Sequence, residues 1–357
     1  MVESKIAEKN TEVSKIIVVT GISGSESRRI CKKYAELTGA KTFSTGEMMA
    51  KAAQPMKNKV PLSEENLLNL NPLLLDNLRE KVFDKIADEI RKKENTRYVI
   101  DTHAQFLWDH VFENAFDWRL LDMINADMYF TIIDKPSNIK KRQMRTEQGR
   151  MQDHDLRDLL LWQNIEVNIT KGWADKYVKP LYVLPSAHEP EMIDSLLFNK
   201  FQIYYQMPMT GITQEQNQHI NDFKAKLLAL GKEITNGILP VIDPRSIDIE
   251  TGEDMDSKVE MAIRRQTNHR DLNWYIGIDA SDLVAYYPPG AGLSRGVSDE
   301  TVRGLETGKN TFVIYQQARS KVSPFMDRAK VVFEDELSFF EYFREYLPKR
   351  LEQLKRK

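Results

Sequence analysis

The sequence is almost free of cysteine. Its 357 residues include one cysteine, Cys31, so an internal disulfide framework is excluded. Cys31 falls in a segment with the pattern of a helix, where we expect a buried thiol with a structural role. Disulfides are typical of oxidising compartments. We therefore predict a cytoplasmic protein.

Long apolar runs are also missing. No run in the sequence approaches the about 18–20 apolar residues that a helix needs to cross a bilayer. The polar first segment, residues 1–14, lacks the apolar centre of a signal peptide. We expect no membrane partner and treat residues 1–14 as a polar lead-in.

A strong excess of either charge is the third absence. The 51 Lys and Arg residues nearly balance the 53 Asp and Glu residues, and the formal net charge is -2. The whole molecule therefore has no strong field that would attract nucleic acid or an anionic membrane. We expect no nucleic-acid partner, whereas small polar or anionic ligands stay open.

What the sequence does contain is an alternation of short apolar strands and longer amphipathic helices. This alternation predicts a parallel sheet with helices on both faces. The predicted elements are strands at 15–20 and near 41–43, a helix at 25–38, helical stretches within 46–53 and 63–94, strands at 97–103 and 127–134, charged helical stretches between 137 and 177, and a strand at 180–185.

The pattern starts again near residue 200. A strand within 201–211 precedes a helix at 214–230, and a helix at 256–276 precedes a strand within 282–290. A length of 357 residues suffices for two domains. We therefore predict an α/β fold of two domains, 15–197 and 200–357, each with its own parallel sheet and with the boundary near 197–201.

A glycine-rich turn follows the first strand, in the segment "GISGSESRR". Such a turn between a strand and a helix lets backbone N–H groups approach a phosphate. Aligned with the pattern G-x-x-x-x-G-K-[ST] from Gly21, the second glycine becomes Glu26, the lysine becomes Ser27 and the Ser or Thr becomes Arg28. Arg28 and Arg29 could replace the charge of the lysine. The other interpretation is a glycine-rich turn without a catalytic role.

Three further segments, "FSTGEMM" (43–49), "VIDTHA" (99–104) and "KKRQMRTEQGRMQD" (140–153), follow in order. Together with the turn, they resemble archaeal-type adenylate kinases and related nucleoside monophosphate kinases, over about 15–190. The resemblance implies a P-loop domain that binds ATP or another nucleotide, with Mg²⁺ near Asp101. The nucleotide-binding residues that it implies are Gly21, Gly24, Ser25, Ser27, Arg28, Thr45, Asp101, His103, Arg142, Arg145 and Arg150.

Each of these residues also has a plain structural interpretation. Asp101 could cap a strand, His103 could be a hydrogen-bonded residue of the interior, and the arginines could form the solvated face of a helix. The order of the segments favours the kinase-like fold. Because the departures fall on the residues that hold the ATP phosphates, an active kinase and a nucleotide-binding pseudokinase both stay open.

The stretch "SRGVSDETVRGLETGK", residues 294–309, carries the second signal. Gly296, Glu300, Gly308 and Lys309 have a spacing that resembles the nucleoside 2-deoxyribosyltransferase-like superfamily, which includes nucleoside 5'-monophosphate N-glycosidases. The resemblance spans about 200–335 and implies a flavodoxin- or Rossmann-like fold. It also implies that Glu300 is the catalytic carboxylate, that this domain needs no cofactor, and that the protein forms homo-oligomers, as dimers or larger assemblies.

Two earlier segments support this resemblance. "HRDLNWYIGIDASDLVAYY", 269–287, implies an assisting acid at Asp282, and "IYYQMPMTG", 203–211, places Tyr204 in the aromatic position. Met207 departs from the pattern, because a glycine is usual there. The resemblance implies catalytic roles for Glu300, Asp282 and Tyr204 and substrate contacts for Ser294, Arg295, Gly296, Thr210 and Gly211.

The residue types fit cleavage of an N-glycosidic bond. A carboxylate beneath the sugar can attack or stabilise the electron-poor anomeric carbon. A second carboxyl group in a different environment can handle the proton of the departing base. The structural alternative makes Glu300 an exposed glutamate at the start of a helix, where the helix dipole stabilises it, and makes Asp282 the cap of a strand.

We therefore predict an enzyme that cleaves or transfers the sugar–base bond of a deoxy- or ribonucleoside 5'-monophosphate, joined to a nucleotide-binding kinase-like domain. One alternative is an active nucleoside monophosphate kinase with a C-terminal nucleotide-binding module. Another is a nucleotide-sensing protein without catalysis. The base, the sugar and the choice between hydrolysis and transfer stay open.

Overall fold

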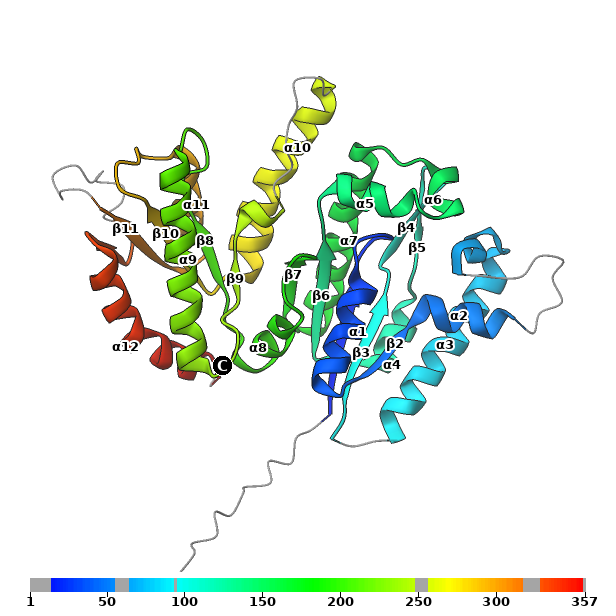
Figure 1. Cartoon of the computed structure of the whole chain (residues 1–357). Coiled ribbons are helices and arrows are strands. Elements are labelled where there is room, and N and C mark those ends of the chain that lie inside the picture. The colour runs from blue at the N-terminus through cyan, green and yellow to red at the C-terminus, as the bar shows by residue number, and fades with distance from the viewer. Residues whose placement is uncertain (1–13, 55–63, 93–94, 248–255, 317–327, 356–357) are drawn as a thin grey trace, which may run out of the picture. The chain divides into compact units, whose positions relative to one another are not determined.

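The computed structural model describes residues 14–54, 64–92, 95–247, 256–316 and 328–355. It divides the chain into two compact units (Figure 1). The first unit comprises residues 1–133 and 137–181, and the second comprises residues 134–136 and 182–357. The predicted boundary at 197–201 stays a prediction. The two five-stranded sheets are built from parallel strands, which confirms the predicted α/β class.

The first sheet has the strand order β2-β3-β1-β6-β7. The strand β1 pairs in parallel with β3 and β6, and β2 pairs in parallel with β3. The elements are β1 Lys15–Thr20, α1 Ser27–Thr38, β2 Lys41–Ser44, α2 Thr45–Ala53, the 3-10 helix η1 Glu64–Asn69, α3 Pro72–Lys92, β3 Arg97–Thr102, β4 Gln105–Trp108, β5 Val111–Asn114, α4 Trp118–Ile124, β6 Met128–Ile133, α5 Pro136–Gln143, α6 Glu147–Gln152, α7 Leu156–Tyr177 and β7 Leu181–Pro185.

The strands of this sheet are apolar because helices cover them. All six residues of β6 are buried, as a central strand of a parallel sheet requires. The helix α1 turns Ile30, Cys31 and Tyr34 inward. Cys31 is therefore buried, as the sequence predicts. The helix α7 begins with a capping box in which Asp155 and Asp158 accept each other's backbone N–H, and this box fixes where the helix starts.

An antiparallel hairpin of β4 and β5 was not predicted from the sequence. Its two-residue turn consists of Asp109 and His110, both with positive φ, 46° and 59°. Turns of this kind are usually marked by Asn-Gly or Asp-Gly. The pair of Asp109 and His110 is not a typical hairpin turn, so the sequence did not predict the hairpin.

The second sheet has the strand order β12-β11-β10-β8-β9, with every pairing parallel. Its elements are α8 Glu191–Asn199, β8 Ile203–Gln206, α9 Gln214–Thr235, β9 Val241–Ile242, the 3-10 helix η2 Pro244–Ser246, α10 Ser257–His269, the π-helix η3 Arg270–Asp279, β10 Asp282–Tyr287, α11 Arg295–Glu306, β11 Asn310–Tyr315, β12 Val331–Phe333 and α12 Glu336–Lys355. The predicted helix at 256–276 is thus an α-helix that changes into a π-helix.

The two faces of the second sheet carry different helices. Ile203 and Tyr205 belong to a core cluster with residues of α9 and α12, which pack side by side (Figure 1). Because side chains alternate along a strand, Tyr204 and Gln206 point to the other face. The helix α11 and the π-helix η3 pack against each other, and α11 also contacts β10 and β11. Within the described residues, no helix has the length and the apolar character that crossing a membrane requires.

Candidate functional sites

The glycine-rich turn of the first unit has left-handed backbone at two positions. Gly24 has φ 89°, and a Cβ atom there would lie 3.2 Å from Ile139. Glu26, which aligns with the second glycine of the phosphate-loop pattern, has φ 75°. Such angles are uncommon for residues other than glycine. The backbone therefore keeps a glycine-like conformation at a position where the sequence has a glutamate.

Side chains of α5 hold the carbonyl groups of this turn. Arg142 donates to the Gly24 carbonyl at 2.6 Å, and Gln143 donates to the Ser23 carbonyl at 2.7 Å. The Glu26 carboxylate pairs with Arg29 and, at 3.3 Å, with Arg142. The negative charge of Glu26 is thus balanced by two arginines beside the turn.

The buried Glu166 of α7 binds the backbone of the same turn and of the segment that follows β3. Its carboxylate accepts the backbone N–H groups of Gly21 at 3.1 Å, Ala104 at 2.8 Å and Gln105 at 2.9 Å. Burial raises the pKa of Glu166 to about 8, and the three N–H donors act in the opposite direction. Glu166 was not predicted as a site residue, because nothing in its local sequence distinguishes it from the other charged residues of that helix.

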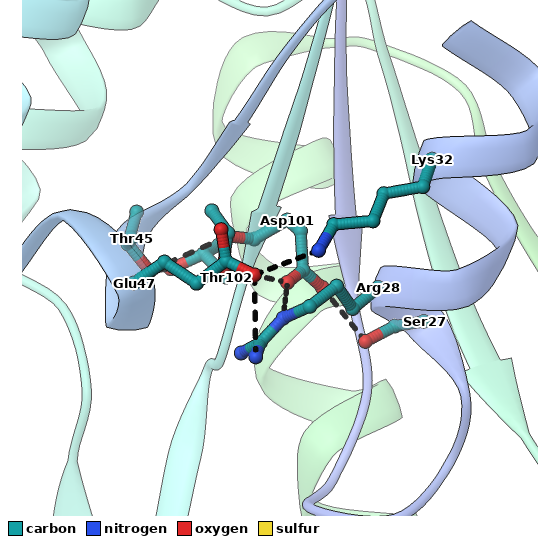
Figure 2. Close-up of polar contacts among 8 residues, drawn as sticks. Ser27, Arg28, Lys32, Thr45, Glu47, Asp101 and Thr102 are labelled. Carbon is teal, nitrogen blue, oxygen red and sulfur yellow. Dashed lines mark hydrogen bonds and ion pairs between the residues drawn. The ribbon is translucent and has the colours of Figure 1, made fainter. Parts of the chain in front are cut away.

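Asp101, at the carboxyl end of β3, is the centre of a polar cluster (Figure 2). Its Oδ1 accepts the Ser27 hydroxyl at 2.7 Å. Its Oδ2 accepts Arg28 Nε at 3.3 Å and the Ser44 hydroxyl at 3.2 Å. Thr45 donates to the Asp101 carbonyl at 3.3 Å. The structure thus brings together residues that the sequence analysis drew from three separate segments.

Beside this cluster lies a cavity of about 740 Å³. Among the predicted nucleotide-binding residues, those that line it are Gly24, Ser27, Arg28, Thr45, Asp101, His103 and Arg142. Gly21 donates its N–H to Glu166, and Ser25 is buried. Arg145 and Arg150 are exposed and do not line the cavity, so their predicted contact with a nucleotide stays a prediction. The cavity is large enough for a nucleotide, since ligand pockets typically measure roughly 300–1,000 Å³.

In the second unit, Glu300 of α11 reaches the carboxyl end of β8. Its Oε1 accepts the Tyr204 hydroxyl at 3.1 Å, and its Oε2 accepts the Gln206 amide at 3.2 Å. The carboxyl ends of parallel strands are where α/β folds usually bind ligands. The structure therefore brings Glu300 and Tyr204 together, and it adds Gln206, which the sequence analysis did not select.

Burial and, to a smaller extent, the negative charge of Asp271 together raise the pKa of Glu300 to about 8. Asp271 lies in the π-helix η3, where it is buried and paired with Arg270 at 2.8 Å. Asp271 was not predicted as a site residue, although it belongs to the segment 269–287. The π-helical turn that carries it has no clear sequence signature.

Asp282, to which the resemblance gives the role of assisting acid, does not lie on the face of the sheet where Tyr204 contacts Glu300. In the sheet register it stands opposite Ile203, and it therefore points to the face that α9 and α12 cover. There its carboxylate accepts the Tyr346 hydroxyl at 2.6 Å and the Asn310 amide at 2.9 Å, and it pairs with Arg350 at 3.2 Å. These partners attach α12 to the sheet, so the contacts of Asp282 are structural.

The remaining predicted substrate contacts lie around the start of α11 and after β8. The Ser294 hydroxyl caps α11 by accepting the Val297 N–H at 3.4 Å. Arg295 is exposed and lies 3.7 Å from Asp299. Gly296, Thr210 and Gly211 are exposed as well. These five residues are accessible to a ligand, and their predicted roles stay predictions.

Comparison with known proteins gives one family match. Residues 20–159 match the family described as AAA domain. No curated protein matches the chain. The match begins at the end of β1 and includes the turn, β3 and most of the residues that line the cavity. Together with the strand-turn-helix geometry, it supports a P-loop, kinase-like and nucleotide-binding first unit.

Several solved kinase structures are similar to about half of the chain. A shikimate kinase from Bacteroides thetaiotaomicron is 12% identical with a TM-score of 0.33, and the match covers 51% of this chain and 94% of that one. A shikimate kinase from Acinetobacter baumannii is 10% identical with a TM-score of 0.35, and the match covers 52% of this chain and 94% of that one. A gluconokinase from Sinorhizobium meliloti is 14% identical with a TM-score of 0.30, and the match covers 51% of this chain and 89% of that one.

Proposed function

We propose that the second unit cleaves the N-glycosidic bond of a deoxy- or ribonucleoside 5'-monophosphate, with Glu300 as the nucleophile. The observation that carries this proposal is the position of Glu300. Its carboxylate is oriented by Tyr204 and Gln206 at the ligand-binding end of the sheet, and burial raises its pKa to about 8. Strongly shifted acids in such positions are typical of catalytic sites.

The proposed chemistry requires one carboxylate oxygen to attack the anomeric carbon of the sugar. The bond to the base breaks, the base leaves with the electron pair and takes up a proton, and water hydrolyses the resulting glycosyl ester. Tyr204 and Gln206 position the carboxylate. Asp271 takes the place of Asp282 as the second carboxyl group of the site, because its negative charge acts on Glu300, and the departing base takes its proton from water.

The first unit, in this proposal, binds a nucleotide in the cavity beside Asp101. Its family match and its turn geometry support a second candidate function, phosphoryl transfer. Ser27 stands where that reaction uses a lysine, so this candidate needs a different source of positive charge. A nucleotide-sensing role without catalysis is the third candidate. We also propose homo-oligomers, which light scattering in solution tests directly.

One experiment separates these functions. The full chain is incubated with ATP and a panel of ribo- and deoxyribonucleoside monophosphates, and the products are separated by chromatography. We expect free base from at least one monophosphate, none from Glu300→Gln, and normal release from Glu306→Gln. The control Glu306 lies on the same helix and is exposed. Full activity in Glu300→Gln contradicts the proposal, diphosphate formation indicates a kinase, and neither product indicates a binding protein.

A further inference from the structure

We propose that the first unit binds the phosphates of its nucleotide without a divalent cation, because Arg28 and Lys32 take the place of magnesium. This inference rests on the proposal that the unit binds a nucleotide. Phosphate loops normally hold Mg²⁺ between a Ser or Thr hydroxyl and an Asp carboxylate. In this unit, the corresponding residues are Arg28 and Asp101.

The donor groups around Asp101 do not fit a magnesium ion. Mg²⁺ requires oxygen ligands in a nearly octahedral arrangement at about 2.0–2.1 Å. Both oxygens of Asp101 already accept hydrogen bonds, from the Ser27 hydroxyl, Arg28 Nε and the Ser44 hydroxyl. Figure 2 shows the side chain of Arg28 beside the Asp101 carboxylate. The arginine is therefore located where the acid would otherwise meet a cation.

Glu47 of α2 completes the arrangement. Its Oε1 accepts Lys32 Nζ at 2.8 Å and lies 3.7 Å from the Arg28 guanidinium. The hydrogen bond from Lys32 lowers the pKa of Glu47, so this acid is ionised at neutral pH. Two carboxylates thus face two cationic side chains, and the four charges cancel. A magnesium ion would add its own two positive charges to a cluster that is already neutral.

The turn itself provides the contacts for an anion. The N-terminus of α1 directs backbone N–H groups to its end, and Glu26 is neutralised by Arg29 and Arg142. Arg29, Lys33 and Arg142 all line the cavity. Among the residues that the structure describes, no group of three or more His, Cys, Asp or Glu side chains could hold a metal ion.

The first arm of the test measures ATP binding to the full chain by calorimetry, once with excess EDTA and once with Mg²⁺. We expect the two dissociation constants of the native chain to differ by less than tenfold. Arg28→Thr introduces the hydroxyl and removes one positive charge beside Asp101 and Glu47, so the cluster gains a net negative charge that repels phosphates. Its affinity should depend on Mg²⁺ by tenfold or more, whereas Arg28→Lys should behave like the native chain.

The matched control is Arg91→Thr. Arg91 is exposed on α3 and paired with Asp88, as Arg28 is with Asp101, but it does not line the cavity. It should leave both constants unchanged. A tenfold or larger requirement for Mg²⁺ in the native chain overturns the inference. Equal behaviour of Arg28→Thr and the native chain overturns the role of Arg28.

The second arm needs no nucleotide and therefore decides the question even if ATP does not bind. Mn²⁺ is titrated into the native chain and Arg28→Thr and followed by electron paramagnetic resonance. We expect Arg28→Thr to bind Mn²⁺ at least tenfold more tightly than the native chain. A native site for one Mn²⁺ that Asp101→Asn abolishes contradicts the inference. Failure of ATP binding in the first arm alone contradicts only the nucleotide proposal.

Discussion

Two glutamates, one in each unit, have the same raised pKa but different partners. Burial raises the pKa of both Glu166 and Glu300 to about 8. Glu166 accepts hydrogen bonds from three backbone N–H groups, whereas Glu300 accepts them from the side chains of Tyr204 and Gln206. Burial thus raises the pKa of both carboxyl groups, although the groups that surround them differ.

The hydrogen-bond donors of Glu166 and Glu300 differ in their freedom to move. Backbone N–H groups keep their direction as long as the fold is intact, and Glu166 is fully buried. A hydroxyl and an amide side chain can rotate, so Tyr204 and Gln206 can follow a change of charge on Glu300. We infer that Glu166 stabilises the turn of the first unit, whereas Glu300 is suited to a reaction.

The largest effect expected from this comparison is the loss of activity in Glu300→Gln. Base release should fall by at least about 1,000-fold, because removal of a nucleophile typically costs that much or more. The thermal midpoint should stay within the error of the native value, since glutamine keeps the shape and one acceptor. Chromatography and calorimetry on the same preparation measure both. A large loss of stability would show that Glu300, too, is structural.

The reverse result is expected for Glu166→Gln. The amide NH₂ would face backbone N–H donors, and leaving buried donors unsatisfied costs about 1–3 kcal/mol each. We expect the free energy of unfolding of the first unit to fall by about 3 kcal/mol. Denaturant unfolding measures it, with Glu300→Gln as the control. An unchanged unfolding curve contradicts the structural role of Glu166.

The pH dependence of base release tests the state of Glu300. Its pKa is raised, so between about pH 4.5 and 8 the folded protein holds a proton that an ordinary glutamate has lost. In the proposed reaction, only the ionised form of Glu300 attacks the sugar. The rate should therefore rise on the order of 50-fold from pH 6 to pH 8 and then level off. A rate at limiting substrate that is flat or falls over this range argues against Glu300 as a nucleophile.

The smallest effect is expected for Tyr204→Phe. The Tyr204 hydroxyl lowers the pKa of Glu300 by donating to its carboxylate. Without it, the pH profile should move to higher pH, and activity near neutral pH should fall by about tenfold, as the loss of a hydrogen bond to a charged group predicts. Tyr205→Phe, on the opposite face of the sheet, is the control. A profile that stays in place shows that the bond has no influence on Glu300.

The sequence pattern predicted most elements of both sheets but not how their faces pair. The predicted strand at 15–20 agrees with β1, and the predicted strand that starts at 97 agrees in its start with β3, because apolar runs in a parallel sheet are easy to recognise. The structure places Ser27 of the turn, Thr45 and Asp101 in contact, since the carboxyl ends of parallel strands lie at one edge of the sheet. The hairpin of β4 and β5 was missed for want of a glycine in its turn.

The face of the sheet to which Asp282 points could not be predicted from the sequence. One residue of strand register decides whether a side chain faces α11 or α12, and the sequence does not contain that register. Asp271 depends on a π-helix, which shifts side chains relative to the α-helical spacing. Both positions depend on which face a side chain occupies, and the sequence predicted a strand and a helix there without the register or the π-helical turn.

The left-handed conformation of Glu26 has a consequence for protein engineering. The turn already has the backbone that glycine would adopt, so a conventional phosphate loop requires no remodelling of the main chain. Exchange of three adjacent side chains, at Glu26, Ser27 and Arg28, would recreate the G-K-[ST] sequence on the existing scaffold. The first unit thus differs from a conventional phosphate loop in the side chains of its turn and not in the backbone conformation at Glu26. It is therefore a starting point for installing phosphoryl transfer by design.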